Sequence, residues 1–201
     1  METKDRILKT ALKLFVEKGF AEVSINDLIK EVGITKGGFY HHFKSKDELI
    51  YEMMESFTFP LLENIIGSID ECNGSVKEKL SCLFRKYSEV QSYLKTTFDI
   101  EDINDTSIMV LIIEGVKRYE TINNYMIDFI ERLTKKIESL LEAGKKLGEI
   151  SSKINSKSGA LYTLSSLEGA IILWGLNPNI EIKKLFEDNF KYLWNSIKAS
   201  D

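Results

Sequence analysis

The pattern of apolar positions along this chain is helical from one end to the other. Apolar residues recur mostly at spacings of three and four, only 2 of the 201 residues are proline, and no stretch shows the alternation typical of a strand. About nine helices account for the sequence on this periodicity. The pattern therefore predicts an all-α protein.

The first fifty residues carry clear signals for helix starts and stops. Hydroxyl side chains suited to capping precede three apolar-periodic segments, and glycines follow two such segments. The expected caps are Ser24, Thr35 and Ser45, and the expected stops are Gly19 and Gly33. Three short helices and the start of a fourth are therefore predicted here.

The rest of the chain continues in longer helices. Pro60 must kink or end the fourth helix, because proline lacks the backbone N–H and clashes with the preceding turn. Asn179 is suited to cap the last helix. A helix over residues 122–147, ended by Gly148, is expected to bury one seam of residues: Ile122, Met126, Ile130, Leu133, Ile137 and Leu140.

The last two predicted helices carry more apolar residues than one buried face requires. Residues 158–176 approach the length of a membrane span, but Glu168 and several serines and glycines interrupt them, and no basic cluster flanks them. They are interpreted as a buried helix. Because a surface helix needs one apolar stripe, the excess on both helices implies a second buried contact, although a core helix of a single protomer would explain one of the two.

Composition and charge exclude several classes of protein. The net charge of −4 and pI near 5.4 do not point to a nucleic-acid partner, yet residues 33–46 hold three lysines and no acid. Cys72 and Cys82 show no zinc or disulfide pattern and are interpreted as ordinary thiols in a reducing cytoplasm. The first residues lack a signal-peptide core, so a cytoplasmic protein is expected.

Two short helices around Gly33, over residues 24–32 and 36–43, match the helix-turn-helix pattern, whose second helix enters the DNA major groove. At 100° per residue, Phe39 and Phe43 share one face and would pack inward, whereas Gly37 and His41 lie opposite. Glycine costs about 1 kcal/mol in a helix, so the Gly37-Gly38 pair needs a reason. Close approach to DNA is one reason, and tolerance of glycine in the first helical turn is the other.

The neighbouring polar residues favour DNA contacts over metal binding. His41 and His42 point about 100° apart on a helix and cannot chelate one metal together. His41 is expected to meet a base edge or a phosphate. The Tyr40 hydroxyl is expected to bond a phosphate, the alternative being an exposed aromatic ring of no consequence. No cofactor is expected.

The run Gly33-Ile-Thr-Lys-Gly-Gly-Phe-Tyr-His-His-Phe-Lys-Ser-Lys-Asp-Glu-Leu49 resembles the TetR/AcrR family of bacterial regulators. The resemblance implies a DNA-binding domain at residues 1–46 and an effector-binding and dimerisation domain at residues 47–201. Gly37 departs from the small or polar side chains common nearby in the family, which puts base readout there in doubt. The residues expected to contact DNA are Thr35, Lys36, Gly37, Tyr40, His41 and Lys46.

The resemblance also implies a homodimer and a small-molecule effector. Glu114, inside an apolar run, is either a polar anchor for an effector or a surface carboxylate. The expected dimer interface comprises Leu167, Ile171, Trp174, Phe186, Leu193 and Ile197. The residues expected to line an apolar pocket, which could equally be plain core, are Met54, Phe57, Phe84, Tyr87, Met109, Ile113 and Tyr162.

These observations predict a dimeric regulator, a repressor released from palindromic operator DNA by an apolar or amphipathic effector. An enzyme is not expected, because no catalytic set of side chains is present. The alternative is a DNA-organising or partner-binding dimer without a ligand. A cavity in the C-terminal part of the chain would separate the two.

Overall fold

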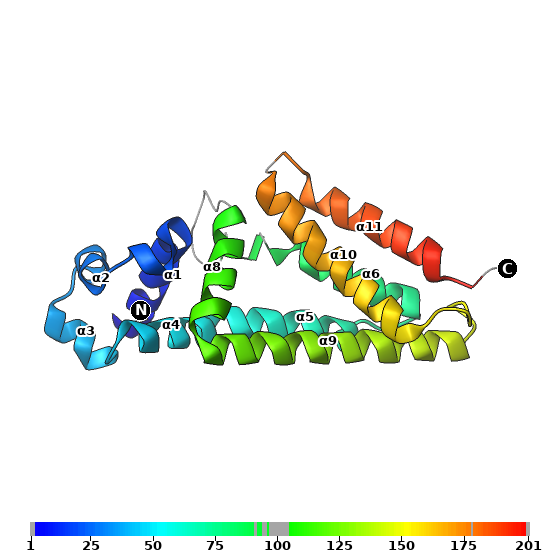
Figure 1. Ribbon diagram of the computed structural model, residues 1–201, viewed down its shortest axis with the longest axis horizontal. Coiled ribbons are helices and arrows are strands. Elements are labelled where there is room, and N and C mark those ends of the chain that lie inside the picture. The colour runs from blue at the N-terminus through cyan, green and yellow to red at the C-terminus, as the bar shows by residue number, and fades with distance from the viewer. Residues whose placement is uncertain (1–2, 91, 94–95, 97–104, 178, 200–201) are drawn as a thin grey trace. The chain divides into compact units, whose positions relative to one another are not determined.

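The computed structural model describes residues 3–90, 92–93, 96, 105–177 and 179–199, without the side chains of residues 105–109 (Figure 1). With α4, η1 and α5 counted as one continuous helix, these ranges form nine helices and no strand, which confirms the all-α prediction. The elements are α1 (Thr3–Glu22), α2 (Ile25–Val32), α3 (Lys36–His42), α4 (Lys46–Met53), η1 (Met54–Thr58), α5 (Phe59–Glu71), α6 (Val76–Ser88), α8 (Asp105–Arg118), α9 (Glu120–Lys146), α10 (Ser156–Leu176) and α11 (Ile182–Ile197).

The helices pack as two compact units. Unit 1 comprises Met1–Leu61 with Ser92–Met126, and unit 2 comprises Leu62–Gln91 with Ile127–Asp201. The division falls within α5 and α9, each of which contributes residues to both units. The expected boundary between the DNA-binding and effector-binding domains, after residue 46, therefore does not coincide with the division between the two packed units.

Unit 1 is built on one core shared by the four N-terminal helices and α8. The rings of Phe15 and Phe20 lie edge to face at 5.0 Å, and Phe20 contacts Tyr119 at 5.9 Å in the same manner. Leu28, Phe39 and the other apolar side chains of the short helices are buried in this core. Because α2, α3 and α4 have only seven or eight residues each, they are too short to be stable alone, and burial in this core holds them in place.

The helix that contains Pro60 neither ends nor breaks there. One π-helical segment, η1, separates α4 from α5, and the N–H of Phe59 donates to the carbonyl of Met54, five residues earlier. A π-turn changes the hydrogen-bond register directly before the proline, where the usual α-helical bond could not form. The expected end of the helix is thus replaced by a local change of helix type.

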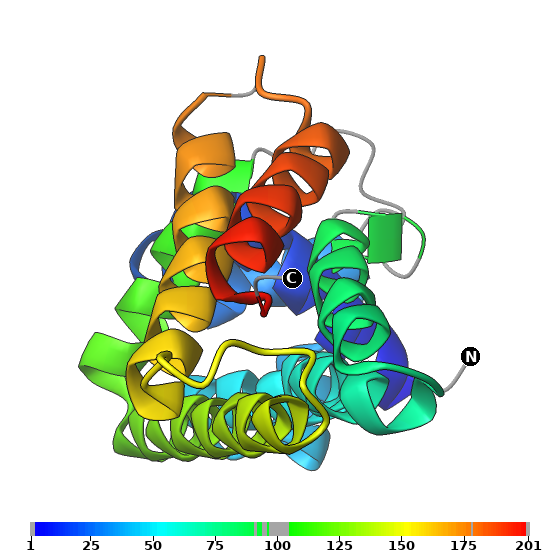
Figure 2. The same cartoon turned by 90° about the vertical axis from the view of Figure 1, so that its right-hand side faces the viewer.

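Unit 2 packs α6, α10 and α11 with the later turns of α9 and of α5. In Figures 1 and 2, α10 and α11 run side by side as an antiparallel pair. Of the predicted seam of α9, three residues are buried: Ile122, Leu133 and Ile137. Ile130 is 42% exposed and Leu140 is half-buried, whereas the neighbouring Phe129 and Leu141 are buried. The helical period of 3.6 residues moves the buried position by one residue here.

By length and composition, α10 is the one helix in the described ranges that could cross a membrane, with a mean hydropathy of 1.2 and 39% of its span buried. A core helix of a soluble protein meets the same criteria, so this is weak evidence for a span. Its Glu168 carboxylate accepts a hydrogen bond from the Tyr87 hydroxyl at 2.8 Å. Burial raises the pKa of both groups.

Two local expectations in unit 2 are wrong. Cys72 and Cys82 are not separate thiols: their sulfurs are bonded, with the Cα atoms 6.5 Å apart. Asn179 does not cap α11, whose N-cap is Glu181 without a side-chain bond, and the Asn179 N–H instead donates to Asn177 Oδ1 at 3.1 Å. Both features depend on the path of a loop, which local residue preferences do not determine.

Candidate DNA-binding surface

The two short helices α2 and α3 begin and end where their capping residues stand. Ser24 Oγ accepts from the N–H of Asp27. The Asp27 carboxylate in turn accepts from the Ser24 hydroxyl at 2.6 Å and from the Ser24 N–H at 2.8 Å, and these two bonds lower the pKa of Asp27. After α2, Gly33 adopts a left-handed conformation with φ 71°, and the N–H of Ile34 donates to the Ile29 carbonyl at 3.1 Å. The helix-turn-helix is thus fixed by local bonds.

Helix α3 presents one buried and one exposed face. Thr35 Oγ1 caps it by accepting from the N–H of Gly38 at 3.0 Å. Phe39 and Phe43 are buried as predicted, with ring centroids 5.8 Å apart. Five of the six residues expected at DNA are exposed on or directly before this helix: Thr35, Lys36, Gly37, Tyr40 and His41. A polar, cationic face of this kind is what a recognition helix presents to base edges and phosphates.

Neither glycine of α3 is demanded by packing within the protein. A Cβ atom added at Gly37 would meet nothing nearer than Thr35 Oγ1 at 3.9 Å, and one added at Gly38 would meet the same oxygen at 3.4 Å. Both have ordinary helical backbone, because their φ angles are not positive. No contact within the protein therefore requires glycine at position 37, which supports close approach of an outside partner to its backbone.

Lys46 is placed differently from the other expected DNA contacts. Its ammonium donates to the Phe20 carbonyl and lies 5.8 Å from the centre of the Phe15 ring. Burial lowers its pKa, against the opposite effect of Glu114. The ammonium has two further N–H donors, and a phosphate contact by Lys46 stays a prediction.

One exposed cation, Lys44, is missing from the DNA contacts predicted from the sequence. Lys44 follows α3 directly and is exposed, and its backbone N–H donates to the Glu48 carboxylate. Its ammonium has no carboxylate partner within the described ranges. Its place beside His41 on the helical projection was the signal that could have identified it.

Glu114 is bonded within unit 1 and is not a free surface carboxylate. It accepts from the Phe20 N–H at 2.9 Å and pairs with Arg118 at 3.1 Å. Phe20 follows Gly19, whose φ of 82° breaks the regular path of α1. The carboxylate on α8 therefore holds the end of α1 in unit 1.

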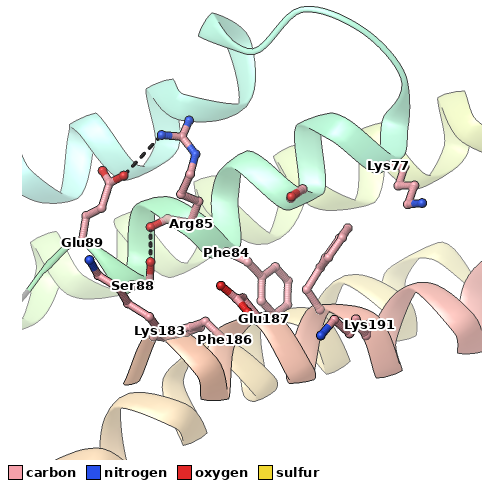
Figure 3. Close-up of a pocket in the computed structure, with 11 residues that line it drawn as sticks. Lys77, Phe84, Arg85, Ser88, Glu89, Lys183, Phe186, Glu187 and Lys191 are labelled. Carbon is pink, nitrogen blue, oxygen red and sulfur yellow. Dashed lines mark hydrogen bonds and ion pairs between the residues drawn. The ribbon is translucent and has the colours of Figure 1, made fainter. Parts of the chain in front are cut away.

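The residues expected to line a pocket fall in both units. Met54, Phe57, Met109 and Ile113 belong to unit 1, and Phe84, Tyr87 and Tyr162 belong to unit 2. Ile113 and Tyr162 are 52% and 58% exposed, and the side chain of Met109 lies outside the described residues. Phe84 alone among the seven lines the groove between α6 and α11 drawn in Figure 3.

Most residues expected at the dimer interface are already buried inside the protomer. Ile171 is half-buried, and the other five are core residues: Leu167, Trp174, Phe186, Leu193 and Ile197. The reason is visible at Phe186, which contacts the rings of Phe84 and Tyr87 on α6 at 6.4 and 6.1 Å. Packing within unit 2 thus uses much of the apolar excess of the last two helices.

The N-terminal part of the chain matches a known family. Residues 7–53 match the family described as bacterial regulatory proteins, tetR family. The chain is 27% identical over 143 residues, 59% of its length, to the uncharacterized HTH-type transcriptional regulator YerO of Bacillus subtilis, and spans 50% of that protein. It is 43% identical over 63 residues, 31% of its length, to the negative transcriptional regulator IcaR of Staphylococcus aureus, and spans 33% of it.

Solved structures extend the likeness of fold to the whole chain. The ketosteroid transcriptional regulator KstR2 of Mycobacterium tuberculosis superposes with a TM-score of 0.75 at 17% identity, over 99% of this chain and 96% of that one. These relatives are transcriptional regulators and not enzymes. With a helix-turn-helix on the matched segment and a helical C-terminal part in the described residues, the chain is similar to the tetR family of bacterial regulatory proteins.

Proposed function

We propose that this protein is a cytoplasmic transcriptional repressor that binds palindromic operator DNA as a homodimer and is released by a small-molecule effector. The observation that carries the proposal is α3, whose exposed face holds Lys36, Gly37, Tyr40 and His41 while Phe39 anchors the other face. Lys36 and Tyr40 are suited to phosphates, and His41 is suited to a base edge or a phosphate.

Helix α10 supports the dimer. Five exposed large apolar side chains lie on it: Leu161, Tyr162, Ile172, Leu173 and Leu176. They flank Ser165 and Gly169, and a Cβ atom added at Gly169 would meet nothing within 4 Å. An apolar stripe of about 22 Å with small residues at its middle suits the close approach of a second helix. The same stripe on a second copy is a self-complementary partner, as a twofold dimer requires.

The groove between α6 and α11 favours the ligand-responsive regulator over the ligand-free alternative. Its volume of about 630 Å³ lies within the range of small-molecule sites, about 300–1,000 Å³. A ligand that binds one conformation better than another shifts operator affinity by that difference, typically about 1–3 kcal/mol.

Selection from a pool of random-sequence duplexes tests the DNA-binding role. The protein should enrich an inverted repeat whose half-sites lie about one helical turn apart, near 34 Å. Lys36→Ala should retain the same repeat with weaker binding, and the exposed unit 2 variant Lys157→Ala should behave as wild type. Absence of any enriched sequence would contradict the proposal.

A further inference from the structure

The groove between α6 and α11 combines an aromatic floor with a charged rim. Phe84 of α6 and Phe186 and Phe190 of α11 line its base, and the ring centroids of Phe84 and Phe190 lie 5.5 Å apart. Both Phe84 and Phe186 are buried, whereas Phe190 is half-buried. Phe190 therefore supplies most of the accessible aromatic surface of this floor.

The rim is cationic although the chain as a whole is acidic. Its charged residues are four cations and two carboxylates, namely Lys77, Arg85, Lys183, Lys191, Glu89 and Glu187. The net charge of the whole chain is −4, so this excess of positive charge is local. A surface of one sign beside an apolar floor selects ligands of the opposite sign.

The cations are not all neutralised by neighbours. Arg85 pairs with Glu89 at 3.3 Å, and Lys191 pairs with Asp188 at 3.2 Å. In the described part of the chain, Lys77 and Lys183 have no carboxylate within ion-pair distance. Exposed ion pairs of this kind are weak, so a ligand anion can replace one partner.

One end of the groove is the more positive. In Figure 3, Lys77 and Lys191 lie toward the same end, and Lys183, Arg85 and Glu89 lie toward the other. The Lys77 ammonium lies 5.8 Å from the centre of the Trp194 ring. Glu89 lies at the opposite end, and Glu187 lies between the two ends.

We propose that this groove binds a small anionic amphiphile, with an acid head group at Lys77 and Lys191 and an apolar body against the half-buried Phe190. The argument is charge complementarity together with a volume of about 630 Å³, which suits a single small molecule. The inference rests on the proposed function only where it identifies this ligand as the effector, because binding of the ligand to the groove does not require DNA.

Two fluorescent probes that differ by one charge test the ligand class. The anionic probe is 1-anilinonaphthalene-8-sulfonate, and N-phenyl-1-naphthylamine has the same rings without the sulfonate. Titrated against the folded protein without DNA, the sulfonate should bind at one site per chain at least ten-fold more tightly, by about 1.4 kcal/mol. Added salt should weaken the sulfonate and leave the amine unchanged.

Variants of exposed residues locate the site. Lys77→Gln combined with Lys191→Gln should weaken the sulfonate about ten-fold and leave the amine unchanged. Glu187→Gln should strengthen the sulfonate, and Lys157→Gln, an exposed lysine at the start of α10, is the matched control that should change neither. Phe190→Leu should weaken both probes, and thermal unfolding checks that each variant is folded.

Three results would overturn the inference. The first is equal affinity for the two probes, and the second is sulfonate affinity unchanged by the double lysine variant. The third is that neither probe binds while Phe190→Asp dissociates an oligomer, which would make the groove a contact between copies of the chain. None of these results affects operator binding. A protein that selects an operator but fails the probe test thus retains the proposed function and loses the inference.

Discussion

Replacement of Gly37 by alanine should make the protein more stable and its DNA binding weaker. Gly37 stands in the first turn of α3, with helical backbone and an exposed position. A methyl group there meets nothing nearer than Thr35 Oγ1 at 3.9 Å, so the folded protein accepts it without strain. The two effects have opposite signs, and a purely structural role for the glycine cannot produce both.

The size of each effect follows from the local structure. Alanine exceeds glycine by up to about 1 kcal/mol inside a helix, and by less in the first turn, so the free energy of unfolding should rise by about 0.5 kcal/mol. For a chain of this length, that gain raises Tm by about 1–2 °C. If the Gly37 backbone lies against DNA, the methyl group must push the helix away, and operator affinity should fall about ten-fold, or about 1.4 kcal/mol.

Gly67→Ala is the matched control. A Cβ atom at Gly67, within α5, also meets nothing nearer than 3.9 Å, there the Glu71 carboxylate. It should raise Tm by a similar amount and leave DNA binding unchanged. Thermal unfolding by circular dichroism and fluorescence anisotropy on a selected operator measure the two quantities. Unchanged operator affinity in Gly37→Ala would refute the close approach of this backbone to DNA.

Three further changes probe other parts of the molecule. Lys36→Ala should weaken all duplex sequences alike and reduce the slope of log affinity against log salt by about 0.9, the value for one phosphate, as measured by anisotropy between 50 and 200 mM salt; a changed sequence preference would reassign Lys36 to base readout. Leu173→Glu on α10 should yield monomers in sedimentation. The control Leu147→Glu also replaces a leucine, one that is 70% exposed directly after α9, and should leave the dimer intact. A dimer that survives Leu173→Glu would show that the interface does not include this face of α10. Because burial raises the pKa of Glu168, its contribution to stability is present below the usual glutamate pKa of 4.5 and is lost as pH rises through the raised value. Glu168→Gln should therefore gain stability relative to wild type between pH 4 and pH 8 in urea unfolding, and a difference independent of pH would contradict this burial effect.

The DNA-binding module could be predicted from sequence because its determinants are local. Ser24 and Thr35 accept hydrogen bonds from N–H groups three residues later, and Gly33 ends α2 in a left-handed conformation. Helical spacing alone places Phe39 inside and His41 outside. Each of these features depends on residues within one turn of helix.

The features that could not be predicted depend on residues distant in sequence. Lys46 bonds the carbonyl of Phe20, and Glu114 bonds the N–H of the same residue from a helix almost a hundred positions later. The groove joins cations of α6 and α11, which share no sequence motif. Spacing predicts the polar face of each helix, but which faces meet is decided by packing.

The apolar surface of the last two helices shows the same limit. Helical spacing predicts their apolar excess, but its division between the protomer core and an outer surface depends on α6. Phe186 and Leu193 face inward, and Leu173 and Leu176 remain exposed. When a helix is apolar on most of its circumference, helical periodicity alone does not show which side faces the protomer core.

The affinity ratio between the selected inverted repeat and a scrambled duplex of equal length and composition tests the central claim most directly. Anisotropy titrations of the wild-type protein at 150 mM salt should give at least about a 10³-fold preference for the inverted repeat, since specific regulators exceed their own non-specific binding by about 10³–10⁷. Equal affinity for the two duplexes would mean that α3 attracts DNA by charge alone, and would contradict a sequence-specific regulator.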